Sequence, residues 1–145
     1  MTERNKLFED AFNLMCGKKI GEGAHRDVFE YRMNTSMVVK VENDLPWRYF
    51  ANVLEMHFWS DHQNYKKVAD WLAPCRWLSP DGLILLQDKC RPLNKEDKLP
   101  DKLPGCLTDV KIDNFGMLGR KLVCFDYAMT IPSPSIRMKK VIWDK

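Results

Sequence analysis

The feature that most constrains the fold is a pair of strand-like segments early in the chain. Residues 27–33 largely alternate apolar with polar side chains, residues 36–42 are rich in valine, and Asn34 and Thr35 lie between the two segments. A period of two and a high content of β-branched residues both indicate strands, and an Asn-Thr pair is typical of a tight turn. Because two strands alone are marginally stable, the segments predict a larger antiparallel sheet. A chain of 145 residues is long enough for such a sheet and a small core.

The rest of the chain supplies further strands and three helices. Strands are expected at 18–21, 75–79 and 83–88, the last two joined by a Ser-Pro-Asp-Gly turn. Helical spacing predicts a helix over 3–16, a second over 47–60, which Pro46 would begin, and a third over 62–72. The apolar residues expected to pack the second helix on the sheet are Trp47, Phe50, Leu54 and Phe58. The expected fold class is therefore α+β with a five-stranded antiparallel sheet.

The second half of the chain is less regular. Residues 91–105 contain three prolines and few apolar side chains, which predicts a surface connection. Residues 115–125 predict a second hairpin, with Gly119 at its turn.

Composition argues against several classes of function. The net charge of +3 is too small to indicate nucleic acid as a partner. The five cysteines contain no Cys-x-x-Cys, and no two histidines stand at metal-ligand spacing, which argues against zinc. No apolar run approaches the roughly 18 residues that span a bilayer, and the first residues do not resemble a signal peptide. We therefore expect a cytoplasmic protein with reduced thiols and no membrane partner.

The strongest functional pattern lies near residue 110. Asp109, Lys111 and Asn114 form an Asp-x-Lys-x-x-Asn segment, and Asp126 follows the apolar strand of the next hairpin. An aspartate can accept a hydroxyl proton, a lysine can neutralise phosphate, and Asn with Asp supplies hard oxygen ligands for Mg²⁺. The alternative for Asp109 is a turn aspartate that caps its own loop.

Three other features could carry chemistry, and each has a structural alternative. Gly21 and Gly23 would let the backbone approach a phosphate, or could simply make a tight turn. Lys40 lies inside an apolar strand, where an edge lysine facing water and paired with Glu42 is the alternative. Glu55 lies about 80° from the centre of the helix's apolar face, so it could reach an interior partner or remain solvated.

Taken in order, these segments resemble the protein-kinase superfamily, as a minimal member in the style of bacterial and phage kinases. Gly21-x-Gly23 is similar to the glycine-rich loop, Val-Val-Lys40 to the strand-3 lysine motif, and Asp126-Tyr-Ala to Asp-Phe-Gly. Asp109 to Asn114 is similar to the end of the catalytic-loop signature. The resemblance covers about residues 18–128. It implies an N-lobe over 1–88, including the helix 3–16, and a much reduced C-lobe over 89–145.

The resemblance also implies a role for each site residue, with ATP and Mg²⁺ as cofactors. Lys40 and Glu55 would form an ion pair, Asp109 would act as catalytic base, and Lys111 would contact the transferred phosphate. Asn114 and Asp126 would bind Mg²⁺. The residues implied in nucleotide binding are Gly21, Gly23, Val28, Lys40 and the hinge residues Gln87, Asp88 and Lys89.

Departures from the family pattern keep a second function open. Leu107 and Thr108 replace the His and Arg of His-Arg-Asp, Ala128 replaces the last glycine of Asp-Phe-Gly, and no Ala-Pro-Glu segment follows. The expected function is an ATP- and Mg²⁺-dependent phosphotransferase, a minimal protein Ser/Thr kinase with a protein substrate. The alternative is a nucleotide-binding pseudokinase that acts by contacting a protein partner. A reduced C-lobe would leave apolar surface for that partner or for a second copy of the chain. A small basic binding module is a third reading.

Overall fold

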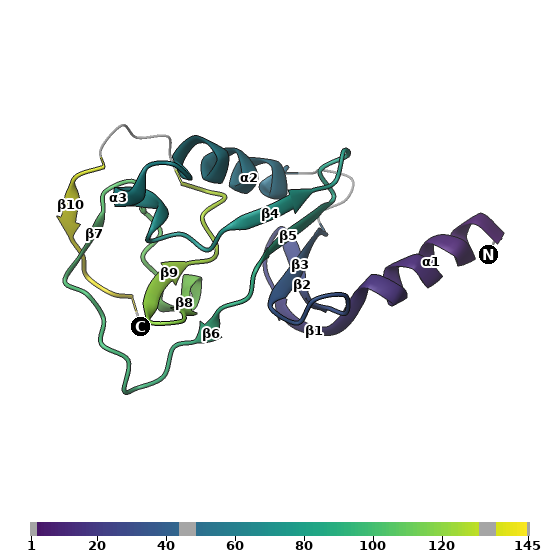
Figure 1. Ribbon diagram of the computed structural model, residues 1–145, viewed down its shortest axis with the longest axis horizontal. Helices are drawn as coiled ribbons and strands as arrows, with labels where there is room; N and C mark the ends of the chain where they lie inside the picture. Colours follow the sequence, from purple (N-terminus) through teal and green to yellow (C-terminus); the bar gives the residue numbers. More distant parts are fainter. Residues whose placement is uncertain (1–2, 44–48, 131–135, 145) are drawn as a thin grey trace. The chain divides into compact units, whose positions relative to one another are not determined.

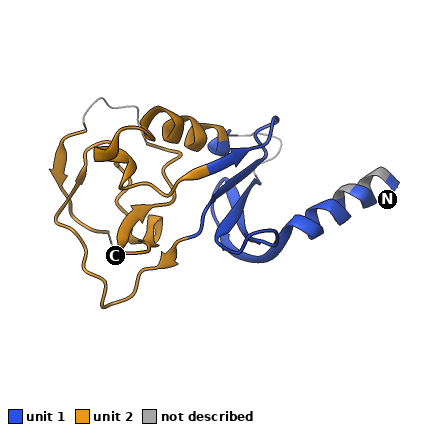
Figure 2. Cartoon of the chain, in the orientation of Figure 1, with its two compact units in different colours: residues 1–52, 76–89 blue, residues 53–75, 90–145 orange. Residues whose placement is uncertain are grey.

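The structure is a computed structural model that describes residues 3–43, 49–130 and 136–144. The chain belongs to the α+β class, and its residues separate into two compact units (Figure 2). Unit 1 comprises Met1–Asn52 and Arg76–Lys89, and unit 2 comprises Val53–Cys75 and Cys90–Lys145. Among the described residues, no helix has both the length and the apolar character needed to cross a membrane.

Unit 1 is built on a five-stranded antiparallel sheet (Figure 1). Its strands are β1 (Cys16–Glu22), β2 (Arg26–Tyr31), β3 (Met37–Glu42), β4 (Cys75–Leu78) and β5 (Ile84–Asp88). Their order across the sheet is β1-β2-β3-β5-β4, so β3 is central. The first residue of β4, Cys75, is grouped with unit 2. The predicted sheet is confirmed, and every strand begins and ends within two residues of its expected bounds.

Turn residues behave as their chemistry predicts. The Asn34 Oδ1 atom accepts hydrogen bonds from the Ser36 backbone N–H at 3.0 Å and from the Ser36 hydroxyl at 2.6 Å. Gly82 closes the β4–β5 hairpin with a φ of 76°, a conformation that favours glycine. These two turns fix the registers of β3 and β5.

The first helix, α1 (Glu3–Met15), ends one residue before its predicted boundary. Phe12 and Met15 of its last turns pack against an apolar cluster around Val39 and Leu86. The Phe12 ring meets the Phe29 ring edge-on at a centroid distance of 5.2 Å. This face of the sheet is therefore covered by apolar contacts.

The second helix, α2 (Ala51–His62), begins later than predicted and buries a different face. Pro46 and Trp47 lie outside the described residues. Phe50 precedes the helix with a φ of 59° and is half exposed, and Leu54 is 42% exposed. The prediction that Phe50 and Leu54 pack on the sheet is therefore wrong. Of the described residues predicted to form the buried face of the helix, only Phe58 is buried. The buried face is formed by Ala51, Asn52, Glu55 and Phe58.

Unit 2 holds short elements around the predicted second hairpin. They are α3 (Lys66–Ala69), β6 (Arg91–Pro92), β7 (Lys102–Pro104), the 3₁₀ turn η1 (Ile112–Asn114), β8 (Phe115–Leu118), β9 (Lys121–Cys124) and β10 (Met138–Lys140). Strand β8 pairs with β9 and β6, and β7 pairs with β10. The hairpin is confirmed, with Gly119 at a φ of 63°. A Cβ atom at Gly116 would lie 2.8 Å from the Arg91 carbonyl oxygen, so β6 approaches β8 closely only because residue 116 is glycine.

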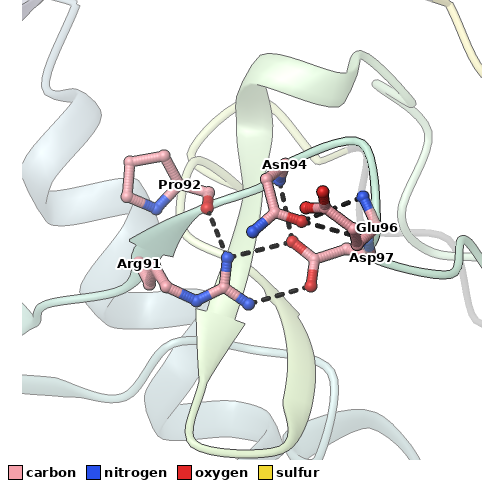
Figure 3. Close-up of polar contacts among 5 residues, drawn as sticks. All are labelled: Arg91, Pro92, Asn94, Glu96 and Asp97. Carbon is pink, nitrogen blue, oxygen red and sulfur yellow. Dashed lines mark hydrogen bonds and ion pairs between the residues drawn. The ribbon is translucent and has the colours of Figure 1, made fainter.

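Residues 91–105 are more than the predicted surface connection. They contain β6 and β7, and Leu103 and Pro104 are fully buried. The loop between the two strands is held by polar contacts among Arg91, Asn94 and Asp97 (Figure 3). We call this set of contacts the Arg91–Asp97 clasp.

Candidate functional site

Lys40 is buried in the central strand of unit 1. It lies opposite Val28 of β2 and Leu85 of β5, and it is 2% exposed. The alternative of an edge lysine facing water is therefore wrong. Burial of an ammonium group is costly unless polar partners surround it, so a lysine here indicates a specific polar environment.

A buried polar network lies on the same face of the sheet as Lys40. Arg26 and Glu42 stand directly opposite each other on β2 and β3. The Arg26 guanidinium donates to the Asn52 Oδ1 atom at 3.3 Å, and the Asn52 backbone N–H donates to Glu42 Oε1 at 2.8 Å. The Asn52 side-chain amide donates to the carbonyl oxygens of Lys40 and Leu83, each at 3.0 Å. The network therefore fixes the backbone of the lysine strand.

Sequence reasoning missed this network. Arg26 was noticeable only as the residue that replaces the third glycine of Gly-x-Gly-x-x-Gly, and Asn52 was hidden among the apolar residues of the helix. The available signal was the pairing of Arg26 with Glu42, because oppositely charged residues face each other once β2 and β3 are placed in register.

Gly21 and Gly23 form a tight connection between β1 and β2. Gly21 pairs with Val28, and the Gly23 N–H donates to the Arg26 carbonyl oxygen at 2.8 Å. The Asn43 side-chain amide also donates to the Gly23 carbonyl oxygen at 3.3 Å. Gly21 is therefore part of the pairing of β1 with β2, and Gly23 is part of the turn that follows. The role of the two glycines toward a phosphate stays a prediction.

The expected hinge residues differ in their surroundings. Gln87 is fully buried in β5, whereas Lys89 is exposed and its N–H donates to the Ser36 carbonyl oxygen at 2.9 Å. The Asp88 carboxylate accepts two hydrogen bonds from the Arg76 guanidinium, at 2.8 and 2.7 Å. That carboxylate is therefore held by a cross-strand ion pair, and the role of these residues as a nucleotide hinge stays a prediction.

In unit 2, Asp109 lies on a loop that is fixed at several points. The Asn114 side-chain amide donates to the Asp109 carbonyl oxygen at 3.2 Å, and the Asn114 N–H donates to the Lys111 carbonyl oxygen at 2.9 Å. Leu107, on the other side, is buried. Asp144 forms a β-bridge with Lys111 and donates its N–H to the Val110 carbonyl oxygen at 3.2 Å. The backbone around Asp109 is therefore held from both ends and by the C-terminal segment.

The Asp109 and Lys111 side chains themselves are exposed. Among the described residues, no hydrogen-bond donor or cation contacts the Asp109 carboxylate. The alternative of an aspartate that caps its own loop is therefore not what the geometry shows. A fixed backbone that presents an accessible carboxylate is the arrangement a general base requires.

Glu55 contacts the segment that carries Asp126. It is fully buried, and its Oε2 atom accepts a hydrogen bond from the Tyr127 backbone N–H at 3.0 Å. The alternative of a solvated helix glutamate is therefore wrong. The Cys124 thiol donates to the Asp126 carbonyl oxygen at 3.3 Å. Asp126 thus has an exposed side chain, while the peptide group that joins it to Tyr127 is anchored by both contacts.

Tyr127 anchors the same segment through its ring. The side chain is 1% exposed, and its hydroxyl donates to the Ala73 carbonyl oxygen at 2.7 Å. The Cys75 Sγ atom lies 3.2 Å from the hydroxyl oxygen. The sequence indicated Tyr127 only as a substitute for phenylalanine, and its polar partners could not be foreseen.

Asn114 and Asp126 have the donor atoms that Mg²⁺ prefers. The Asn114 Nδ2 atom is used by the Asp109 carbonyl oxygen, which leaves the Oδ1 atom as the ligand of that amide. Within the described ranges, no three or more His, Cys, Asp or Glu side chains cluster as a metal site. A site made of one carboxylate, one amide oxygen, phosphate oxygens and water is typical of Mg²⁺, so the residues present fit this ion.

No protein-family model matches the sequence, and no curated protein matches it significantly. Membership of the protein-kinase superfamily therefore rests on the residues described above and stays a prediction. The same holds for the ion pair between Lys40 and Glu55, which belong to different units.

Proposed function

We propose that the chain is an ATP- and Mg²⁺-dependent phosphotransferase, acting as a minimal protein Ser/Thr kinase. The observation that carries the proposal is the Asp109 loop. Its carboxylate is exposed without a partner among the described residues, while Asn114 holds the Asp109 backbone from five residues away. The usual structural role of a loop aspartate is to accept hydrogen bonds from nearby N–H groups, and among the described residues the Asp109 carboxylate accepts none.

In the proposed reaction, a substrate hydroxyl oxygen attacks the γ-phosphorus of ATP, and the bond from that phosphorus to the β-γ bridging oxygen breaks. Asp109 accepts the hydroxyl proton, and ADP leaves with the electron pair of the broken bond. Lys111, two residues along the same fixed loop, holds the negative charge of the transferred phosphate. Lys40 and the turn at Gly21 and Gly23 bind the nucleotide phosphates.

Asn114 and Asp126 would hold Mg²⁺, which when bound neutralises phosphate charge. The contribution of this chain is to fix the two ligands before the ion arrives. Asn114 is fixed through Asp109, and the peptide group that joins Asp126 to Tyr127 is fixed by Cys124 and Glu55. Such preorganisation reduces the ordering that binding requires.

The second candidate is a pseudokinase that binds nucleotide without transferring phosphate. Leu107 favours it, because this residue is 4% exposed and packs where the family pattern has the histidine of His-Arg-Asp. A buried leucine cannot supply the polar contacts of that histidine.

The deciding experiment measures transfer of label from γ-labelled ATP with Mg²⁺, to the protein itself and to proteins of a cell lysate. We expect Asp109→Ala to reduce transfer by a factor on the order of 10² or more, as for loss of a positioned base. The matched control is Asp113→Ala, which removes an exposed carboxylate from the same loop and should transfer normally.

A thermal-shift titration separates the two candidates. Stabilisation by ATP with Mg²⁺ that EDTA and Asp126→Asn both abolish, without any label transfer, would establish the pseudokinase. Undiminished transfer by Asp109→Ala would show that the base lies elsewhere, and neither transfer nor stabilisation would refute both candidates.

A further inference from the structure

Unit 2 contains a cavity of about 480 Å³ that the proposed phosphotransfer does not use. Its walls come from three places in the chain: Asp70 and Trp71 after α3, residues 97–100, and the β8–β9 hairpin with residues 120–122. The volume lies within the range of about 300–1,000 Å³ that is typical of ligand sites.

One wall of the cavity is fixed by the Arg91–Asp97 clasp (Figure 3). The Arg91 guanidinium donates to both carboxylate oxygens of Asp97, at 3.0 and 2.8 Å, and to the Pro92 carbonyl oxygen at 2.9 Å. The Asn94 N–H donates to Asp97 Oδ2 at 2.8 Å, and Asn94 Oδ1 accepts from the N–H groups of Glu96 and Asp97. The clasp therefore holds the loop up to Asp97, the first of the residues 97–100 that line the cavity.

The charges around the cavity do not balance. Asp97 is held by Arg91, and Asp70 accepts a hydrogen bond from the Lys121 ammonium at 3.2 Å. Lys98 and Arg120 are exposed, and no carboxylate of the described residues lies within ion-pair distance of either. The cavity therefore carries two uncompensated cations.

Apolar residues line the same cavity as these cations. Trp71, Leu99, Met117 and Leu122 contribute to the lining, and all are partly exposed. A ligand that fits must bring both an apolar group and negative charge.

We propose that this cavity binds a segment of another protein that places an apolar side chain beside acidic residues. The apolar side chain would contact Trp71 and Leu99, and its acidic neighbours would pair with Lys98 and Arg120. A polyphosphate fits less well, because it brings no apolar group to Trp71 and Leu99. An oligonucleotide also fits less well, because it carries one negative charge per phosphate and so brings more charge than two cations can pair. The proposal does not depend on phosphotransfer, since peptide binding needs neither ATP nor Asp109.

The test is a selection of random eight-residue peptides on the immobilised full-length protein. Peptides that bind the wild-type protein are then passed over the immobilised double variant Lys98→Glu/Arg120→Glu, and those that also bind the variant are discarded. The matched control is Lys139→Glu/Lys140→Glu, which makes the same change of charge at exposed positions of β10 outside the cavity. Binding of the selected peptides is then measured by fluorescence anisotropy.

We expect peptides that combine Asp or Glu with Leu, Phe or Trp, with at least tenfold weaker binding to the cavity variant and unchanged binding to the control. When these peptides are added to the wild-type protein, the amide NMR crosspeaks that shift most should be those of Leu99 and Arg120 and their neighbours. This measurement needs no variant, so it holds even if the cavity variant fails to fold. Peptides that bind both double variants equally, basic consensus sequences, or shifts centred elsewhere would overturn the proposal. Preferential binding of an oligonucleotide through Lys98 and Arg120 would overturn it as well.

Discussion

Removing the hydroxyl group of Tyr127 should destabilise unit 2 without changing its chemistry. The hydroxyl is buried, donates to the Ala73 carbonyl oxygen at 2.7 Å and lies 3.2 Å from the Cys75 Sγ atom. Since the tyrosine proton is used by Ala73, the thiol is the group that can donate to the phenol oxygen. Tyr127→Phe removes both interactions and leaves the ring in place.

The expected size follows from the burial of the partners. A neutral hydrogen bond contributes about 0.5–1.5 kcal/mol, and loss of a donor at a buried carbonyl raises the penalty to about 1–3 kcal/mol. Ala73 is 0% exposed and Cys75 is 5% exposed, so water cannot easily replace the phenol. We expect the free energy of unfolding to fall by about 2 kcal/mol, which for a chain of this size lowers the Tm on the order of 5 °C.

Urea unfolding followed by both circular dichroism and tryptophan fluorescence measures the change, and coincidence of the two curves checks that one transition is observed. The matched control is Tyr65→Phe in the same unit, because Tyr65 is 42% exposed and its hydroxyl has no partner among the described residues. Equal stability of the two variants would refute the hydrogen-bond network around Tyr127. Label transfer by folded Tyr127→Phe should persist, since phenylalanine is the residue of the family pattern at this position.

Two further predictions concern titratable groups. Burial raises the pKa of the Cys16 and Cys106 thiols, so at pH 8 iodoacetamide should modify Cys90, the one cysteine that is not buried, before either of them, as mass spectrometry can follow. Equal modification rates of the three thiols would contradict this order. Because the folded protein disfavours the thiolates of Cys16 and Cys106, the free energy of unfolding should also fall as the pH rises past about 8.5, the ordinary pKa of a thiol. The Arg91 guanidinium holds the pKa of the Asp97 carboxyl below its ordinary value. The clasp should therefore be complete above about pH 3.9, the ordinary pKa of an aspartate, and open only at lower pH. In Asp97→Asn the backbone amides of the clasp should exchange their hydrogens with solvent rapidly at neutral pH. Slow hydrogen exchange in that variant would show that the ion pair does not hold the loop.

The sheet of unit 1 could be predicted because its signals are local. The alternation over residues 27–33 and the Ser-Pro-Asp-Gly turn each depend on a few neighbouring residues, and the structure contains the strand and the turn that they predict. The buried face of α2 could not be predicted in the same way, because two of its members, Asn52 and Glu55, are polar and are buried only where specific partners exist. A prediction from helical periodicity uses only the positions of apolar residues. It therefore placed Leu54 on the buried face, and Leu54 is exposed.

The sequence predicts candidate site residues, but it does not predict the contacts that hold them. The Asp-x-Lys-x-x-Asn spacing places Asp109 and Asn114 on one short loop, and the structure joins them by a hydrogen bond. The contacts of that loop with Asp144, and of Tyr127 with Ala73, join residues more than thirty positions apart. No pattern within a window of the sequence encodes such contacts. The Arg91–Asp97 clasp was missed for a different reason, since proline and charge over 91–105 indicate a loop whether or not it is ordered.

The buried polar residues of α2, which helical periodicity did not predict, contact segments that carry candidate site residues. Burying an amide or a carboxylate destabilises a fold unless hydrogen bonds compensate, so a helix selected for stability alone would place apolar side chains at 52 and 55. Instead Asn52 binds the backbone of the strand that carries Lys40, and Glu55 binds the backbone next to Asp126. Each polar residue is bonded within its own unit, and each bond ends at a segment that carries a candidate site residue. The departure from the apolar pattern thus coincides with the two places where the proposed chemistry needs a fixed backbone.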